Sequence, residues 1–210
     1  MAFDFKKEYK EFYLPKKKPG IIDIPSMNFV AISGKGDPNE EGGTYKEAIE
    51  LLYGIAYTIK MSYKSKYSIE GFFEYVVPPL ECLWWMVDMK SIDYNRKKYL
   101  RWISMIRIPD FVKETDFEWA VKEATRKKKK DFSKVMYLQH KEGLCVQCMH
   151  MGAYDNEPAT IRQMEEYANK KGYTTDITSS RLHHEIYLKD PRKCSPEKLK
   201  TVIRIPVKPG

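Results

Sequence analysis

The chain has 210 residues, of which 42% are hydrophobic, 31% charged and 13% aromatic, and its formal net charge is +8. This composition is typical of a globular protein with a sizeable core, and it argues against a disordered chain. Part of the excess charge lies in two basic runs, 16–18 and 126–130, which contain no aromatic residues. We interpret it as solvated surface charge and expect no nucleic-acid partner.

No apolar run is long enough to span a bilayer, so we expect no membrane segment. The first 18 residues mix aromatic residues with lysines and lack an apolar stretch, which argues against a secretory signal. The four cysteines are Cys82, Cys145, Cys148 and Cys194. Because they are few and irregularly spaced, we expect reduced thiols and a cytoplasmic location.

The first half of the chain predicts an arm, a strand, a helix and further strands. Residues 1–20 predict a basic N-terminal arm, and residues 28–33 predict a short strand that a glycine-rich loop ends. Thr44 with Glu47 forms a capping-box pattern before a helix with one apolar face. Further strands are expected at 72–77, 83–87 and 101–108, with a polar insertion at 88–98.

A second capping-box pattern, Thr115 with Glu118, predicts a connecting helix at about 115–131. Beyond it the order strand, helix, strand, strand recurs. The expected strands are 145–151, 182–188 and 201–207, and the helix begins near Pro158 and ends before Gly172. The recurrence predicts an α+β fold built by internal duplication. Its first unit covers about 21–112 and its second unit about 140–208.

Both units end in the tetrapeptide Ile-Arg-Ile-Pro, at 106–109 and 203–206. A match of four residues is weak evidence by itself, because Ile-Asp-Ile-Pro at 22–25 is nearly the same. The shared order of elements is the stronger argument for duplication.

Cys145 and Cys148 have the spacing of a zinc or redox pair, and His150 lies nearby. However, the pair falls within a predicted strand, where residues three apart point to opposite faces. No turn or helix N-terminus is predicted there to bring the thiols together or lower their pKa. The chain also lacks a phosphate-binding loop and a nucleophile elbow. We therefore predict no metal site and no cofactor.

The strand predicted at 182–188 is the most informative segment. One of its faces carries Leu182, His184, Ile186 and Leu188, and the other carries His183, Glu185 and Tyr187. We expect the aliphatic face to pack on helices, which leaves a carboxylate between an imidazole and a phenol. The alternative is an ordinary sheet face open to water.

Two other regions are candidates for the ligand site. Trp84 and Trp85 are adjacent on a predicted strand, so they point to opposite faces, and one of them could line a cavity. The alternative is that both belong to the core. Tyr154 lies in a loop at the end of the strand that opens the second unit, and the alternative there is a simple turn.

These residues carry a resemblance to the GyrI-like small-molecule-binding family. The similar stretches are Met-His-Met-Gly-Ala-Tyr at 149–154 with Glu-Pro-Ala-Thr-Ile at 157–161, His-Glu-Ile-Tyr-Leu-Lys-Asp-Pro-Arg-Lys at 184–193 with Pro-Glu-Lys-Leu-Lys-Thr at 196–201, and Pro-Pro-Leu-Glu-Cys-Leu-Trp-Trp at 78–85. The likeness covers roughly residues 20–210. It implies two pseudo-symmetric strand-helix-strand-strand units with antiparallel sheets and a ligand cleft between them.

The resemblance also implies a function. In effector domains of multidrug-sensing activators, a buried Glu at the position of Glu185 meets cationic aromatic drugs, and some stand-alone members hydrolyse cyclopropanoid DNA-alkylating toxins. This chain looks like a stand-alone member, because no DNA-binding motif precedes the module. We therefore expect a lipophilic aromatic ligand, and we favour its hydrolysis over binding alone.

We assign the base that activates water to Glu185, and expect burial to raise its pKa toward neutrality. Tyr187 or Tyr154 would donate a hydrogen bond to the developing oxyanion. The expected ligand-binding residues are Trp84, Trp85, Tyr57, Trp102, Met105, His183 and Glu81. The alternatives are a non-catalytic drug-binding, sequestering or sensing protein and, less favoured, an inhibitor of a DNA-handling enzyme. The sequence identifies no protein partner.

Overall fold

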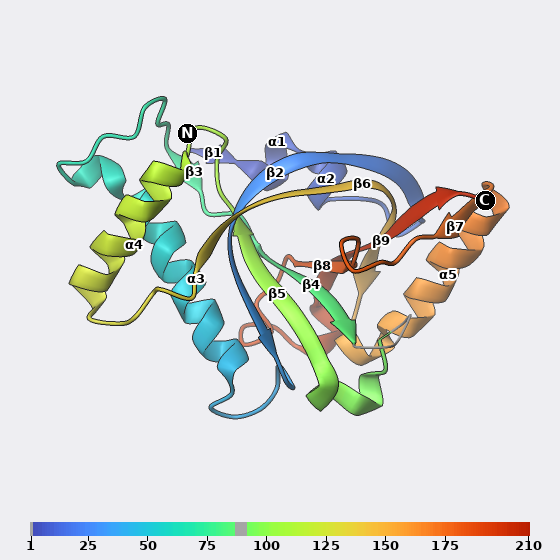
Figure 1. The fold of residues 1–210 in the computed structure, drawn as a ribbon. Coiled ribbons are helices and arrows are strands. Elements are labelled where there is room, and N and C mark those ends of the chain that lie inside the picture. The colour runs from blue at the N-terminus through green and yellow to red at the C-terminus, as the bar shows by residue number, and fades with distance from the viewer. Residues whose placement is uncertain (1, 87–91) are drawn as a thin grey trace.

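Six antiparallel strands form the centre of the molecule in a computed structural model that describes residues 2–86 and 92–210 (Figure 1). They are β2 Gly20–Lys35, β4 Leu80–Met86, β5 Leu100–Arg107, β6 Met136–Met151, β8 His183–Tyr187 and β9 Lys200–Pro209. They pair in the order β6, β2, β5, β4, β8, β9, and β9 pairs back with β6. The sheet therefore closes into a ring with an inner and an outer face. The short strand β7 Tyr173–Thr175 extends β9 beyond the ring.

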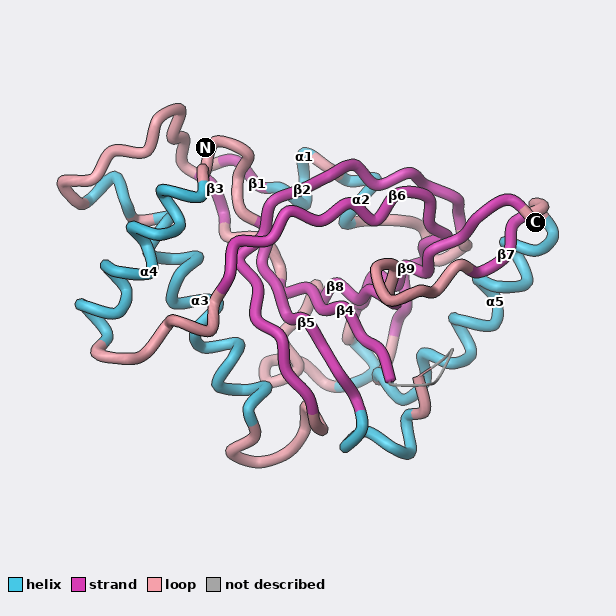
Figure 2. The backbone as a smooth tube through the Cα atoms, in the orientation of Figure 1, coloured by secondary structure: helices cyan, strands magenta, loops and turns pink. Residues whose placement is uncertain are grey.

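Long helices cover the outer face of the ring. They are α3 Thr44–Lys60, α4 Glu114–Lys128 and α5 Glu157–Lys170. Figures 1 and 2 show α3 and α4 together at one side of the strands and α5 at the opposite side. The predicted apolar face of α3 is buried against β2, β4 and β5, so helix amphipathicity explains this packing. Within the described residues, no helix is long and apolar enough to cross a membrane.

The two units of the predicted duplication are visible in the strand order. The first contributes β2, α3, β4 and β5, and the second contributes β6, α5, β8 and β9. In the β4–β8 register Leu80 pairs with Tyr187 and Cys82 pairs with Glu185, which places a pseudo-twofold axis between these strands. The predicted α+β fold with duplicated units is confirmed. The expected antiparallel sheets are joined into one continuous ring.

The local predictions differ from the structure mainly at the ends of elements. The strand expected at 28–33 is far longer in β2, whereas the one expected at 72–77 reduces to β3 Tyr75–Val76. Neither capping box forms as predicted. Thr44 donates to the Lys35 carbonyl instead, and the α4 cap uses the Asp116 carboxylate on the Lys113 N–H. Residues 87–91, which include part of the expected insertion, lie outside the described residues.

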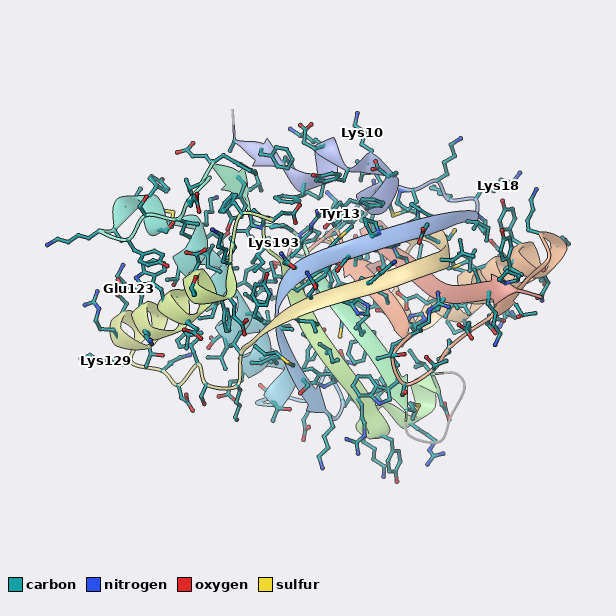
Figure 3. The ribbon with its side chains drawn as sticks, turned by 45° about the horizontal axis from the view of Figure 1, so that its top comes forward. Lys10, Tyr13, Lys18, Glu123, Lys129 and Lys193 are labelled. Carbon is teal, nitrogen blue, oxygen red and sulfur yellow. The ribbon has the colours of Figure 1, made fainter. Side chains whose placement is uncertain are left out.

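The N-terminal arm packs onto the ring. It contains β1 Phe3–Asp4, α1 Phe5–Glu8 and α2 Lys10–Tyr13. The side chains of Phe5 and Tyr13 are buried together with Ile186 of β8 and Val202 of β9. In Figure 3, Tyr13 is labelled between the arm and the arching strands. The segment predicted only as a basic arm is thus part of the core that fills one side of the ring.

The remaining short elements are 3-10 turns. They are η1 Ser62–Lys64, η2 Tyr94–Tyr99, η3 Tyr154–Asn156 and η4 Pro196–Lys198. Of these, η3 leads directly into α5, and this connection places one end of α5 beside β8.

Candidate functional site

Strand β8 carries polar side chains on both of its faces, and all of them are buried except Tyr187, which is partly buried. His183, Glu185 and Tyr187 point to the outer face, beneath the helices, whereas His184 points to the inner face. The side chains of His183 and Glu185 keep 6% and 8% exposure, but His184 keeps none. His183 and Glu185 therefore keep a small exposed fraction, whereas His184 is fully enclosed.

This arrangement modifies one sequence expectation. The aliphatic face of β8 was expected to pack on helices, and Ile186 packs on Phe5 of α1 and Tyr13 of α2, the short helices of the arm. The polar face is also covered, because it lies under the longer helices α3 and α5. The reason is the closure of the sheet into a ring, which buries both faces of β8 in a way that a single strand pattern does not reveal.

The carboxylate of Glu185 is the centre of the outer cluster. His183 Nε2 lies 3.0 Å from its Oε1, and the Tyr187 hydroxyl donates to its Oε2 over 2.8 Å. The carboxyl of Glu157, at the start of α5, lies beside it, with a carboxyl oxygen of each residue within 4.8 Å of the other. Because Glu157 is completely buried, this contact brings a second acidic group to the same point. We define the outer cluster as Glu157, His183, Glu185 and Tyr187.

Aromatic side chains surround the outer cluster. The indole N–H of Trp84 donates to the Tyr187 hydroxyl over 2.8 Å, and the Tyr154 ring meets the Tyr187 ring edge-on at 5.7 Å between centroids. Tyr45 of α3 lies against Trp84 at 5.5 Å. Trp102, which is buried, packs edge-on against Tyr45 at 5.1 Å. Flat rings around a polar centre suit an aromatic ligand.

The electrostatics of the cluster differ from the sequence expectation. Burial by itself raises the pKa of Glu185, as expected. Hydrogen bonds with His183 and Tyr187 outweigh it, so the pKa of this carboxyl is lowered. Burial raises the pKa of the Tyr187 and Tyr154 hydroxyls, and the nearby Glu185 charge raises both further. Glu185 is therefore ionised, and both phenols remain proton donors.

The outer cluster also has the donor set of a cation site. Glu157, His183 and Glu185 each offer one ligand atom, and these atoms lie within 4.8 Å of one another. Carboxylate and imidazole ligands of this kind suit zinc and related ions. In the structure His183 Nε2 and Glu185 Oε1 are engaged with each other at 3.0 Å. Cys145 and Cys148, where no metal site was expected, have separate partners, because Cys145 contacts Glu142 and Cys148 contacts the Lys17 carbonyl.

Four residues that were expected in the site lie elsewhere. Glu81, Trp85 and Met105 have their side chains on the inner face of the ring, because they alternate with the outward residues of β4 and β5. Tyr57 lies on the surface of α3 with 50% exposure, beside Tyr53. The structure therefore brings together Glu185, Tyr187, Tyr154, His183 and Trp84, with Trp102 behind Tyr45.

Glu157 and Tyr45 complete the site although the pattern of the sequence did not single them out. Each stands in the first turn of a helix, where an exposed acidic or polar residue is common. The signal for Glu157 was its place just before Pro158 in the motif that carries the family resemblance. Its burial depends on how η3 turns into α5, which a single sequence does not show.

A second group of buried polar side chains lies on the inner face of β8. His184 Nδ1 is 2.9 Å from Glu142, and its Nε2 is 3.1 Å from Glu81. Arg204 pairs with Glu142 at 2.7 Å and donates to the Phe12 carbonyl at 2.6 Å. We define this inner cluster as Glu81, Glu142, His184 and Arg204. Its charges are matched and enclosed, so it is a structural network and not an accessible site.

Known structures resemble the whole chain. A hydrolase from Listeria innocua is 44% identical, with a TM-score of 0.90 over 99% of this chain and 100% of its own. An uncharacterized conserved protein from the same organism is 46% identical, with a TM-score of 0.92 over the same shares. The EcmrR C-terminal domain is 14% identical, with a TM-score of 0.55 over 92% of this chain and 98% of its own, and it shares the fold.

A search of curated proteins finds no match. Residues 17–208 match the family described as GyrI-like small molecule binding domain. This range begins within the arm and includes every residue of the outer and inner clusters. The chain therefore belongs to the GyrI-like family of small-molecule-binding domains.

Proposed function

We propose that the outer cluster binds a lipophilic aromatic molecule and hydrolyses a cyclopropanoid compound, in which a cyclopropane is conjugated to a dienone. The observation that carries this proposal is the buried carboxylate of Glu185, with the Tyr187 hydroxyl at 2.8 Å, among aromatic side chains. The hydrolases of Listeria innocua that are 44% identical over the whole chain support a hydrolytic activity. The substrate class rests on the family resemblance of the motifs.

The chemistry of such a ring opening needs one acceptor and one donor of protons. The water oxygen bonds to the unsubstituted carbon of the cyclopropane, and the C–C bond of that carbon to the dienone ring breaks. Its electron pair moves through the dienone to the carbonyl oxygen, which becomes a phenolate. One proton leaves the water and one reaches the phenolate, so the product is the substrate plus one water.

Glu185 and Tyr187 are placed to share these proton transfers. Glu185 holds the water and takes its proton as the C–O bond forms, because the water becomes more acidic at that stage. Tyr187 gives its proton to the phenolate and regains one from Glu185 across their 2.8 Å hydrogen bond. Tyr154 is a second donor beside Tyr187. The rings of Trp84 and Tyr45 hold the flat ligand and exclude bulk water.

Mass spectrometry of products after many turnovers tests the proposal. Wild-type protein should convert an excess of a spirocyclopropyl dienone into a compound heavier by one water. Glu185→Gln should lower kcat by about 10²–10⁴-fold, the usual effect of losing a positioned acid or base. Glu123→Gln, which changes a partly exposed carboxyl that pairs with Arg126 on α4, is the control and should keep the wild-type rate. Absence of excess product, or normal turnover by Glu185→Gln, would show that the mechanism is wrong.

A second function, binding without hydrolysis, is supported by the same site. Glu185 is already hydrogen-bonded to His183 and Tyr187, which lowers its pKa and weakens it as a base. A protein of this kind would sequester or sense its ligand. In the same experiment it would return the intact cyclopropane on denaturation. Glu185→Gln should then weaken binding of cationic dyes more than of neutral ones, by titration calorimetry.

A further inference from the structure

His150 connects the end of β6 to η3 and α5. Its side chain is buried, with 4% exposure. The imidazole Nδ1 is 2.8 Å from the Thr160 hydroxyl of α5, and Nε2 is 3.0 Å from the Ala153 carbonyl, which directly precedes η3. These two partners delimit the stretch of chain that carries Tyr154 and Glu157 into the candidate site.

We propose that His150 is a positioning residue, whose two hydrogen bonds hold η3 and the start of α5 so that Tyr154 and Glu157 stand beside Glu185. The inference rests on the proposed function, because it names a residue that supports the same site. It adds a side chain that acts through other residues and does not itself contact the ligand.

The position of His150 in the sheet excludes a direct role at the reacting atoms. On the outer face it pairs with Thr201 of β9, and Thr201 pairs with Tyr187 of β8. Neighbouring strands lie about 4.8 Å apart, so the backbones at His150 and Tyr187 are about 10 Å apart. Both ring nitrogens of His150 are also engaged already. Its effect on the site therefore passes through η3 and α5.

The two hydrogen bonds fix the orientation of the imidazole ring. A carbonyl oxygen only accepts, so Nε2 carries the hydrogen that it donates to Ala153. In the neutral ring Nδ1 is then an acceptor, and the Thr160 hydroxyl donates to it. Because a buried polar group is stable only when it is paired, one tautomer and one ring orientation satisfy both partners. The ring thereby sets the distance between η3 and the first turn of α5.

Other contacts hold this segment less completely. Gly152, with a φ of 126°, turns the chain out of β6, and its N–H donates to the Leu199 carbonyl over 3.1 Å. This bond fixes where the turn begins but does not reach α5. Lys97 pairs with Asp155 at 2.7 Å, but the Asp155 side chain is 71% exposed, and exposed ion pairs stabilise little. His150 is buried and binds both ends of the segment.

Kinetics with the spirocyclopropyl dienone measure the positioning role. His150→Ala should lower kcat by about 10–100-fold, because a misplacement of about 1 Å can have an effect of this size. The affinity for N-methylquinolinium, a flat aromatic cation without a cyclopropane, should fall less, since Trp84 and Glu185 lie on other elements. His150→Gln keeps an amide that can donate to the Ala153 carbonyl, so it should recover most of the lost kcat.

Two Thr→Val substitutions form a matched pair, because each replaces a hydroxyl by a methyl group of similar shape. Thr160→Val removes the hydroxyl that bonds to His150, and it should lower kcat in the same direction as His150→Ala. Thr201 is the neighbour of His150 on β9, and its buried hydroxyl has no hydrogen-bond partner among the described residues. Thr201→Val should therefore keep the wild-type kcat.

Magnetic resonance gives readouts that do not depend on activity. Nitrogen spectra of the wild type should show His150 with a hydrogen on Nε2 and none on Nδ1, and His150→Gln assigns this signal among the four histidines. The rings of Tyr154 and Tyr187, whose centroids are 5.7 Å apart, should show an Overhauser contact that weakens in His150→Ala and in Thr160→Val. If His150→Ala does not fold, the wild-type spectrum and Thr160→Val still decide the matter.

The possible results distinguish this inference from the proposed function. If the wild type forms no hydrolysis product but the variants lose the ring contact, hydrolysis is wrong and the positioning of η3 by His150 stands. If the wild type hydrolyses the dienone while His150→Ala keeps the ring contact or the wild-type kcat, the positioning role is wrong. A hydrogen on Nδ1 with none on Nε2, or a loss of kcat in Thr201→Val equal to that in Thr160→Val, would also overturn it.

Discussion

At the scale of single residues, the inner cluster is sensitive to the loss of one charge. Glu142 is buried and pairs with both His184 and Arg204, and these two positive groups lower its pKa although burial opposes them. Glu142→Gln leaves two buried cations without this partner. We expect it to lower the free energy of unfolding by about 3–5 kcal/mol.

Urea denaturation of the variant checks this prediction. Glu123→Gln is the matched control, because it removes a carboxylate that pairs with Arg126 and Lys127 on the surface of α4. Exposed ion pairs contribute about 0–1 kcal/mol, so the control should unfold close to the wild-type midpoint. An equal loss of unfolding free energy in the two variants would mean that the inner cluster stabilises the fold no more than a surface ion pair does.

His184 gives this cluster a pH dependence. Burial alone would lower its pKa, but Glu142 and Glu81 raise it from 6.5 to about 9. Between these two values the folded state binds more protons than the unfolded state, so stability decreases as the pH rises. The contribution is complete below pH 6.5 and is lost as the pH passes about 9. Unfolding free energies measured from pH 6 to 10 should show this decline.

His184→Gln tests the assignment of the pH effect. The variant should be less stable at pH 6, and its stability should change less between pH 6.5 and 9. A wild-type curve that is flat over this interval, or a variant with the same slope as the wild type, would contradict the raised pKa. The neighbouring His140 is a useful internal contrast, because burial lowers its pKa.

At the scale of elements, the arm is held by both copies of the repeated tetrapeptide. Arg107 at the end of β5 lies over the rings of Phe5 and Tyr9, at 4.8 and 4.7 Å. Arg204 in β9 donates to the Phe12 carbonyl. The duplication therefore supplies two arginines at equivalent places on the inner face, and the arm contacts both of them.

We predict that the arm is required for the stability of the ring. Tyr13 is buried, and its hydroxyl donates to Glu81 over 3.3 Å. Tyr13→Ala removes a large aromatic group from the core and should cost about 3–5 kcal/mol. Leu14→Ala is the control from the same arm, because Leu14 is 48% exposed, and it should change stability by less than about 0.5 kcal/mol. Guanidinium denaturation measures both.

The sequence could predict what depends on local periodicity. Alternation along β8 placed His183, Glu185 and Tyr187 on one face, and the structure agrees. It could not show which face would meet the helices, because that depends on the pairing of β6 with β9 and β2, over a long separation in the chain. Alternation along β4 places Glu81 and Trp84 on opposite faces, so both could not have belonged to one site.

The rest of the site depends on long-range contacts of the same kind. Glu157 reaches Glu185 because η3 turns the chain back across the sheet, and the sequence contains no local signal of its burial. The burial of the N-terminal arm also depends on long-range contacts. Its aromatic residues are a visible pattern, but the partners that bury them come from strands more than 60 residues away, as the Tyr13–Glu81 bond shows.

At the scale of the whole molecule, the pseudo-twofold axis explains where the site lies. Leu80 pairs with Ile106 in the first unit, and Glu185 pairs with Ile203 in the second. Because these isoleucines begin the repeated tetrapeptide, Leu80 is the structural counterpart of Glu185. By the same relation Cys82 corresponds to Tyr187. Between β4 and β8, Leu80 pairs with Tyr187 and Cys82 pairs with Glu185, so the four positions lie together around the axis.

Both halves of the duplication therefore contribute to one candidate site at the axis, and they do not form two separate sites. The position of Glu185 and that of its counterpart meet at the axis, and the second unit alone supplies the carboxylate. We predict that each chain binds one aromatic ligand, although its fold is duplicated. Native mass spectrometry with an excess of N-methylquinolinium should show one bound molecule per chain, and Glu185→Gln should reduce this occupancy without adding another. Two equivalent bound molecules would place ligands away from the axis, and the outer cluster could not then be the binding site for both.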